Sequence, residues 1–467
     1  MRLRKHEIGQ RINADLQIEF AEQELTSFSG LELLRRYFRI IGLNSRIRQA
    51  FRAYDFKGDY AVVDIILVFA ALWFTGGSRL RHVRYLAGDP LVERLCNLLR
   101  IPSERTLSRW LRQFTNDSLQ ALVTLNSELV FEKLETMGLG TVTLDLDGTV
   151  LSTGNRVQWA FRGYNPHNRH AKSYFPILCH VAQTGHFLQV KNRPGNIHDA
   201  KGGALKVIKD CVHQIRERLP GIRIEVRMDS AFFQQEILRY LSKNNIRYAV
   251  KVPMWKWLKL KETINARKHW YHAHEKLAWF KKAVHIEPWD HEVEMTFYRE
   301  KLSDKPPKHH QLDLFTPNDG TYEYSVLCSN KKLSPESLLD FYNGRCAMEH
   351  QIGELKGEFA FDSIPTQHYQ GNSAYQQLSI MAYNLVRNFQ IDTRLTTERE
   401  RSVSRTNVLA FDSLKTLRFE WINVAGRLVN RSGRKILRMN NNETREETFG
   451  YIADALTKLR LPSRKRE

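Results

Sequence analysis

The order of strands and helices between Thr141 and Val252 constrains the fold more than any other feature of the sequence. The segment TVTLDLDGTVL, which starts at Thr141, is rich in β-branched residues and predicts a strand. Apolar spacing and turn residues then indicate two or three further strands, a helix, a strand, a helix and a last strand. The order β-β-β-α-β-α-β predicts a mixed α/β layer.

Acidic residues occupy distinctive positions in this layer. Asp147 lies in the first strand, and Asp229 ends the later strand IRIEVRMDS. Asp145 lies two residues before Asp147, so both side chains point to the same face and either could be the functional acid. Carboxylates at strand ends are ligands of the kind that Mg²⁺ prefers, and two such ions can clamp an in-line phosphoryl displacement.

A second pattern lies in the segment LLDFYNGRCAMEHQIGELKGEF. Tyr342, Arg345, Glu349 and Lys356 have offsets of zero, three, seven and fourteen residues. On one helix these offsets fall within an arc of roughly 60°. The stripe fits a solvated helix with ordinary ion pairs. It also fits a third acid that faces Asp147 and Asp229 from a helix.

Charge and composition indicate the class of partner. The chain has 467 residues, 71 Lys plus Arg against 51 Asp plus Glu, and a formal charge of +20. Such an excess, spread along the chain, favours a nucleic-acid partner over a membrane surface. The five cysteines are widely separated, which favours a reducing cytosol over a zinc or disulfide framework. The apolar run Ile65 to Phe74 predicts a buried helix that is too short to cross a bilayer.

The helical N-terminal region contains a helix-turn-helix candidate at residues 90–114. Ser103 is a suitable N-cap for its second helix, which would display Arg105 and Arg109. Such a helix could read DNA. A helical hairpin with an exposed basic face explains the same pattern equally well.

Changes in composition and in the spacing of apolar residues along the chain predict five regions. They are a helical DNA-binding region at 1–135, a first core segment at 136–255, a β-rich insertion at 256–320, a second core segment at 321–392 and a C-terminal DNA-contact or dimerisation region at 393–467.

Within the C-terminal region, three segments have separate predictions. Thr393 to Ser404 is expected to be a charged linker, and LRFEWINVAGRLVNRSGRKILRM a basic hairpin about Ser432–Gly433. The last helix is expected at Thr448–Leu459.

Four motifs together resemble the DDE transposases of bacterial insertion sequences. They are Asp147-Gly148-Thr149, Arg193-Pro194-Gly195-Asn196, Asp229-Ser230 and the Y-x2-R-x3-E-x6-K signature that starts at Tyr342. The resemblance covers about residues 140–390. It implies a ribonuclease H-like mixed sheet flanked by helices, with a β-rich insertion before the glutamate and a helical N-terminal DNA-binding region.

The resemblance also implies an activity and a set of site residues. The enzyme would cut transposon ends at inverted repeats, form hairpins and join the ends to target DNA, as a homodimer on double-stranded DNA in the bacterial cytoplasm, associated with the nucleoid. Asp147, chosen over Asp145 because a small residue and a threonine follow it, would hold Mg²⁺ with Asp229 and Glu349, and Mn²⁺ would substitute. Tyr342, Arg345 and Lys356 would contact DNA near the cut, and Tyr324 matches the position of a base-stacking aromatic.

Two other functions fit the same fold. One is a ribonuclease H-like endonuclease that cleaves without strand transfer. The other is an inactive DNA-binding regulator, although all three acids are present.

Overall fold

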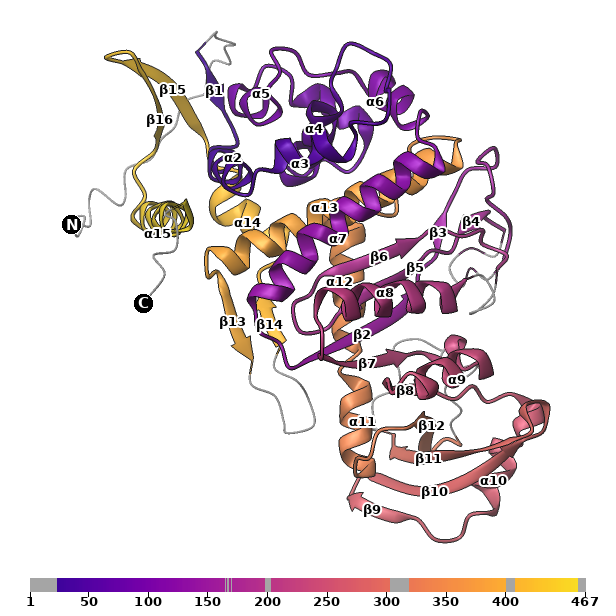
Figure 1. Ribbon diagram of the computed structural model, residues 1–467. Coiled ribbons are helices and arrows are strands. Elements are labelled where there is room, and N and C mark those ends of the chain that lie inside the picture. The colour runs from indigo at the N-terminus through magenta and orange to yellow at the C-terminus, as the bar shows by residue number, and fades with distance from the viewer. Residues whose placement is uncertain are drawn as a thin grey trace, which may run out of the picture.

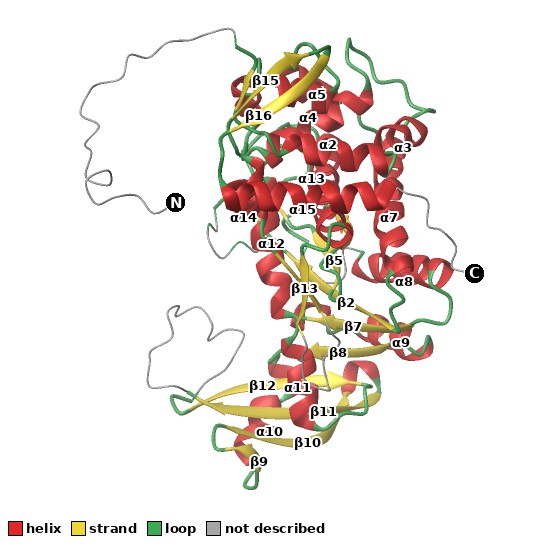
Figure 2. Ribbon diagram, turned by 90° about the vertical axis from the view of Figure 1, so that its left-hand side faces the viewer, coloured by secondary structure: helices red, strands yellow, loops and turns green. Residues whose placement is uncertain are grey.

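The computed structural model describes residues 23–163, 165, 168, 170–197, 203–302, 319–399 and 408–460. The main parts of the molecule follow one another along its longest dimension. Figures 1 and 2 show the N-terminal helices and C-terminal elements at one end, a mixed sheet in the middle, and the long strands β10 to β12 at the other end.

The N-terminal region is helical, as the apolar spacing predicts. The apolar run lies within α4 and is almost wholly buried in the protein core, so it is a core helix. No helix in the described parts of the chain is both long and apolar enough to cross a bilayer. The helices are α2 (Leu31–Ile40), α3 (Leu43–Ala50), α4 (Val62–Phe74), α5 (Pro90–Cys96), α6 (Glu104–Leu111) and α7 (Asn116–Thr136), with a 3₁₀ turn at Leu80–Tyr85.

The helix-turn-helix candidate consists of α5 and α6. Ser103 caps α6 as predicted, since its hydroxyl accepts the Thr106 N–H at 3.3 Å. The two helices are joined by residues 97–103. The apolar side of α6 is buried and its arginines are exposed.

The middle of the molecule is a ribonuclease H-like sheet, which confirms the predicted fold class. Its first five strands have the order β6-β5-β2-β7-β8, with β2 antiparallel to β5 and parallel to β7. These strands are β2 (Thr141–Gly148), β5 (Ile177–Val181), β6 (Phe187–Lys191), β7 (Arg223–Met228) and β8 (Arg247–Lys251), and β3 (Leu151–Ser152) pairs with β4 (Ser173–Tyr174) beside them.

Helices cover both faces of this sheet. Apolar residues on one face of β2 and β7 pack with α8 and α9 in one core cluster, whereas α12 and α13 belong to a second cluster. The helix α13 is buried along nearly its whole length. The helices are α8 (Ala204–Arg218), α9 (Gln235–Lys243), α11 (Pro335–Asn343), α12 (Cys346–Phe359) and α13 (Tyr369–Asp392).

The strands between β8 and α11 extend the same sheet. β12 pairs antiparallel with β8, and β11, β10 and β9 follow in order, so a single sheet has nine strands. These elements are α10 (Leu260–Ala266), β9 (Tyr271–His274), β10 (Leu277–Ile286), β11 (His291–Lys301) and β12 (Tyr322–Ser329).

The C-terminal elements differ from the sequence prediction in three places. The expected charged linker contains β13, which pairs with β14, and the segment LRFEWI is helical, so the predicted basic hairpin is shorter and starts at Gly426. The last helix starts at Glu443, before the predicted Thr448. The elements are β13 (Thr396–Arg399), β14 (Val408–Phe411), α14 (Leu414–Leu417) with a π-helical turn at Arg418–Ile422, β15 (Gly426–Arg431), β16 (Arg434–Met439) and α15 (Glu443–Arg460), and β1 (Leu25–Thr26) pairs with β15.

Candidate active site

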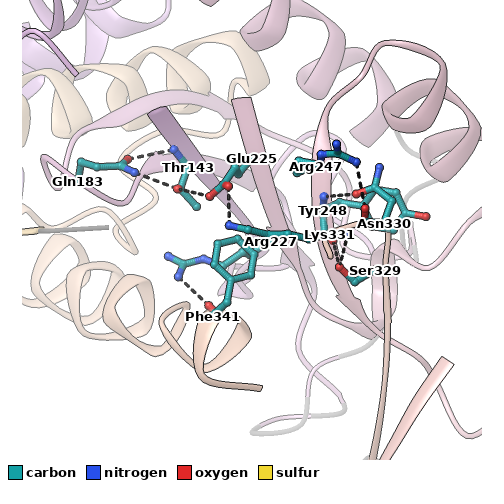
Figure 3. Close-up of polar contacts among 10 residues, drawn as sticks. All are labelled: Thr143, Gln183, Glu225, Arg227, Arg247, Tyr248, Ser329, Asn330, Lys331 and Phe341. Atoms are coloured by element: carbon teal, nitrogen blue, oxygen red, sulfur yellow. Dashed lines mark hydrogen bonds and ion pairs between the residues drawn. The ribbon is translucent and has the colours of Figure 1, made fainter. Parts of the chain in front are cut away.

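One face of the strands β2 and β7 carries polar and charged residues at every second position. Their side chains meet because the two parallel strands are in register. The facing pairs are Thr143 with Glu225 and Asp145 with Arg227. Figure 3 shows the first pair in a chain of contacts from Gln183 through Thr143 and Glu225 to Lys331. The last facing pair is Leu146 with Met228, and Asp147 and Asp229 come directly after it, close enough for the charge of Asp229 to raise the pKa of Asp147.

Asp145 is fully buried, and an arginine engages both of its oxygens. Arg227 Nε lies 2.6 Å from Oδ1 and Nη2 lies 2.8 Å from Oδ2, while His180 Nδ1 lies 3.7 Å from Oδ2. Burial by itself would raise the pKa of Asp145, but Arg227 and His180 hold it below its usual range. Asp145 is therefore committed to an internal ion pair.

Asp147 faces the helix α12 at the end of β2. Arg345 Nη1 lies 3.1 Å from its Oδ2, and the Gly148 N–H donates to its Oδ1 at 2.8 Å. Burial, and then the charges of Asp229 and Glu349, raise the pKa of Asp147 to about 7 despite Arg345. The site therefore holds more negative charge than a single guanidinium neutralises.

Asp229 follows β7 directly and starts a short 3₁₀ turn. Its Oδ1 accepts the Ala231 N–H at 3.0 Å, which fixes the side chain at the strand end. Burial raises the pKa of Asp229, and the charge of Glu349 acts in the same direction. The second carboxylate is thus oriented by its own backbone.

The predicted single helix from Tyr342 to Lys356 is broken into α11 and α12 at Gly344 and Arg345. The carbonyl of Phe341 would normally accept the Arg345 N–H, but it accepts Arg227 Nη1 at 2.9 Å, as Figure 3 shows. The Arg345 N–H donates instead to the Tyr342 carbonyl at 3.0 Å. Gly344 leaves room for this guanidinium, because a Cβ at this position would lie 2.2 Å from Arg227 Nη1.

Arg345 lies between the carboxylates of Asp147 and Glu349. Its Nη2 is 3.6 Å from Glu349 Oε1, and Glu349 is 59% exposed whereas Arg345 is 12% exposed. Burial lowers the pKa of Arg345, but the charges of Asp147, Asp229 and Glu349 raise it above its usual range. Glu349 is the most accessible of the three acids.

The other two signature residues lie at the same place. The ring of Tyr342 lies under Arg345, whose guanidinium carbon is 6.0 Å from the ring centroid. Lys356 Nζ donates to the Val150 carbonyl at 3.3 Å, just beyond Asp147, and burial lowers its pKa. The helix break therefore does not separate the four residues of the stripe.

Lys251 is a neighbour that the sequence pattern did not single out. It ends β8, the parallel strand next to that of Asp229, and burial followed by the charge of Arg345 lowers its pKa. The predicted strand order already places the end of this strand at the same sheet edge as Asp229, so it could have identified Lys251. Arg227 was missed in the same way, although IRIEVRMDS places it on the face of Asp229.

Three predicted DNA contacts lie elsewhere. Tyr324 is in β12, where its hydroxyl donates to Asp319 Oδ2 at 2.6 Å and its ring is 6.1 Å from that of Trp270. Arg105 lines a cleft of about 630 Å³ together with Arg79, Arg81 and residues 152–154, which follow β2 in the chain. Arg109 is exposed on α6 and is not among the residues that line this cleft.

The acids fit a hard divalent cation by their chemistry, since three carboxylates offer only oxygen ligands. Within the described ranges, however, no three His, Cys, Asp or Glu side chains are grouped closely enough to share one ion. The guanidinium of Arg345 lies between Asp147 and Glu349 and separates these two carboxylates.

A ribonuclease H-like sheet with acids at neighbouring strand ends defines a class of enzymes that transfer phosphoryl groups on nucleic acids. The model of the family described as "Transposase DDE domain group 1" matches residues 9–461, and the chain belongs to this family. It is a DDE transposase.

Comparisons with other proteins add little to this assignment. The piggyBac transposase in a synaptic complex with hairpin DNA, solved by cryo-electron microscopy, aligns with a TM-score of 0.43 and 11% identity over 94% of this chain and 87% of that chain. A search of curated proteins found no match.

Proposed function

We propose that this transposase moves a bacterial insertion sequence by a cut-and-paste reaction. It binds terminal inverted repeats, nicks DNA in the presence of Mg²⁺, forms hairpin ends and joins them to target DNA. The observation that carries the proposal is the placement of Asp147 and Asp229 at neighbouring strand ends, with Glu349 across Arg345 on α12.

Asp147, Asp229 and Glu349 are the residues that would hold Mg²⁺. The bound ions supply an activated oxygen nucleophile and neutralise charge on the transferred phosphoryl group. Mn²⁺ accepts the same oxygen ligands and is expected to substitute. Among the candidate acids, Asp145 is excluded as a ligand in this proposal, because Arg227 already occupies both of its oxygens.

Arg345 has a second role in the proposal. Without DNA it offsets the repulsion between the acids, and a DNA phosphate offers it a competing partner with favourable two-point geometry. A turn of Arg345 toward phosphate would free Asp147 and Glu349. Tyr342 and Lys356, which lie next to it, would then contact the same stretch of backbone.

The DNA would continue from the acids into the cleft that Arg79, Arg81 and Arg105 line. Three guanidinium groups outnumber the two carboxylates of the cleft, Glu104 and Asp362, and this positive excess favours a phosphate backbone. Tyr324 and Arg109 are proposed to contact DNA outside this cleft. The active form is proposed to be a homodimer that pairs two ends, in the bacterial cytoplasm and associated with the nucleoid.

The stability of the metal-free protein is expected to depend on Asp147. Its pKa is 3.8 in the unfolded chain and about 7 in the folded protein, so folding favours its protonated form. This contribution is complete below pH 3.8 and is lost as the pH rises through about 7. Thermal unfolding in EDTA should show the loss, and Asp147→Asn should lack it. Added Mg²⁺ should raise the unfolding temperature of the wild type most above pH 7. Equal pH profiles for the two proteins would contradict this assignment.

A strand-transfer assay tests the proposed function. The substrate is a plasmid that carries the DNA flanking the coding region, incubated with target DNA and either Mg²⁺ or EDTA. We expect nicked, hairpin and joined products with Mg²⁺ only. Cut ends that never join would indicate an endonuclease, and intact DNA despite binding would indicate an inactive regulator.

A further inference from the structure

The hairpin of β15 and β16 forms a ribbon at the end of the molecule opposite β9 to β12, as Figures 1 and 2 both show. The two strands form six facing residue pairs from Gly426↔Met439 to Arg431↔Arg434. Ser432 and Gly433 form its turn, and both have positive φ. We call residues 426–439 the ribbon.

The ribbon has an inner and an outer face. On the inner face, Leu428 is buried in the core and Leu437 packs against it. Alternate residues form the outer face, where Val429 faces Ile436 between two arginine pairs. Ile436 is 39% exposed. The two arginine pairs are Arg427 with Arg438 and Arg431 with Arg434, and all four arginine side chains are exposed.

The outer face places like charges directly opposite each other. Such pairs destabilise a sheet, so nothing in the folding of the ribbon itself favours them. Within the described part of the chain, none of these four guanidinium groups forms an ion pair with a carboxylate. Lys435 on the inner face, by contrast, pairs with Glu24 at 2.8 Å. The positive charge of the outer face therefore does not stabilise the fold, and it is available to bind a partner.

We propose that the outer face of the ribbon binds duplex DNA as a second contact, distinct from the acids of the active site. This rests on the proposed function and extends it. The major groove admits a two-stranded ribbon, and guanidinium groups bind phosphates or guanine edges in pairs. Arg427 and Arg431 are about 13 Å apart along the strand, so the two arginine pairs reach separate parts of the groove wall. Val429 and Ile436 between them suit thymine methyl groups.

Salt-dependent binding of a fluorescent mixed-sequence duplex tests the proposal. The variants are Arg431→Gln, Arg434→Gln and the replacement of all four outer arginines by glutamine. Lys435→Gln is the matched control, since it removes one charge from the inner face. The logarithmic salt slope should become shallower by about 0.9 for each lost phosphate contact, and Lys435→Gln should keep the wild-type slope. The arginine variants should fold at least as stably as the wild type, because repulsion is removed.

Unchanged affinity and slope in the fourfold variant would overturn the proposal. A change in oligomeric state by light scattering, with DNA binding unchanged, would overturn it too and make the face a protein interface. The proposed function fails separately: it fails if the wild type never nicks or joins DNA in Mg²⁺, whatever the ribbon binds.

Discussion

Asp147→Asn is expected to lower Mg²⁺-dependent DNA nicking by at least about 10³-fold while leaving DNA binding intact. The substitution keeps the shape of the side chain but removes the charge that a divalent cation requires. Because Asp147 stands among other acids, its loss should not weaken the fold. Initial nicking rates on labelled end DNA, together with binding measured in EDTA, give both quantities.

Asp229→Asn and Glu349→Gln should behave in the same way. Glu262→Gln, which changes an exposed acid on α10, is the control that should retain full activity. A folded Asp145→Asn protein that is inactive, beside an active Asp147→Asn protein, would show that the first acid is assigned wrongly.

Arg227→Gln is expected to lower the free energy of unfolding by about 3–5 kcal/mol, because it leaves the carboxylate of Asp145 buried without its partner. Both side chains lie in the protein interior, with exposures of 7% for Arg227 and 0% for Asp145. The Phe341 carbonyl would lose its donor as well. Chemical denaturation followed by circular dichroism measures the effect.

Arg218→Gln is the matched control for this second prediction. It removes an arginine from an ion pair with Glu135 whose members are 34% and 37% exposed, and such surface pairs contribute at most about 1 kcal/mol. The double variant Arg227→Met with Asp145→Leu should recover part of the loss, since no charge is then left unpaired. Equal destabilisation by Arg227→Gln and Arg218→Gln would show that the buried pair does not hold the sheet together.

Much of the fold could be predicted because local patterns determine it. The alternation in TVTLDLDG and IRIEVRMDS identifies β2 and β7 and assigns Asp147 and Asp229 to one face. The buried α4 follows from its unbroken apolar run. The prediction was wrong for LRFEWI, which is helical because Trp421 and Ile422 pack into the core.

The parts that could not be predicted depend on contacts between distant segments. The resemblance favours Asp147 over Asp145, but it gives no sign of the ion pair between Arg227 and Asp145, which depends on the register of β2 with β7. The break at Gly344 has the same origin, since Arg227 takes a helix carbonyl that helical spacing assigns to Arg345. The spacing of residues along a helix cannot reveal that a side chain from a distant strand donates to one of the helix carbonyls.

The pairing of β12 with β8 has a consequence for how this chain can tolerate change. Three residue pairs, from Leu327↔Lys251 to Ser329↔Ala249, cover the outer edge of β8. An uncovered strand edge recruits strands from other molecules, so β12 protects the protein against aggregation. Changes in length of the loops that join β9, β10 and β11 should be tolerated among relatives, because β12 then stays paired with both β8 and β11. Loss of β12 should not be tolerated, because it would uncover the edge of β8.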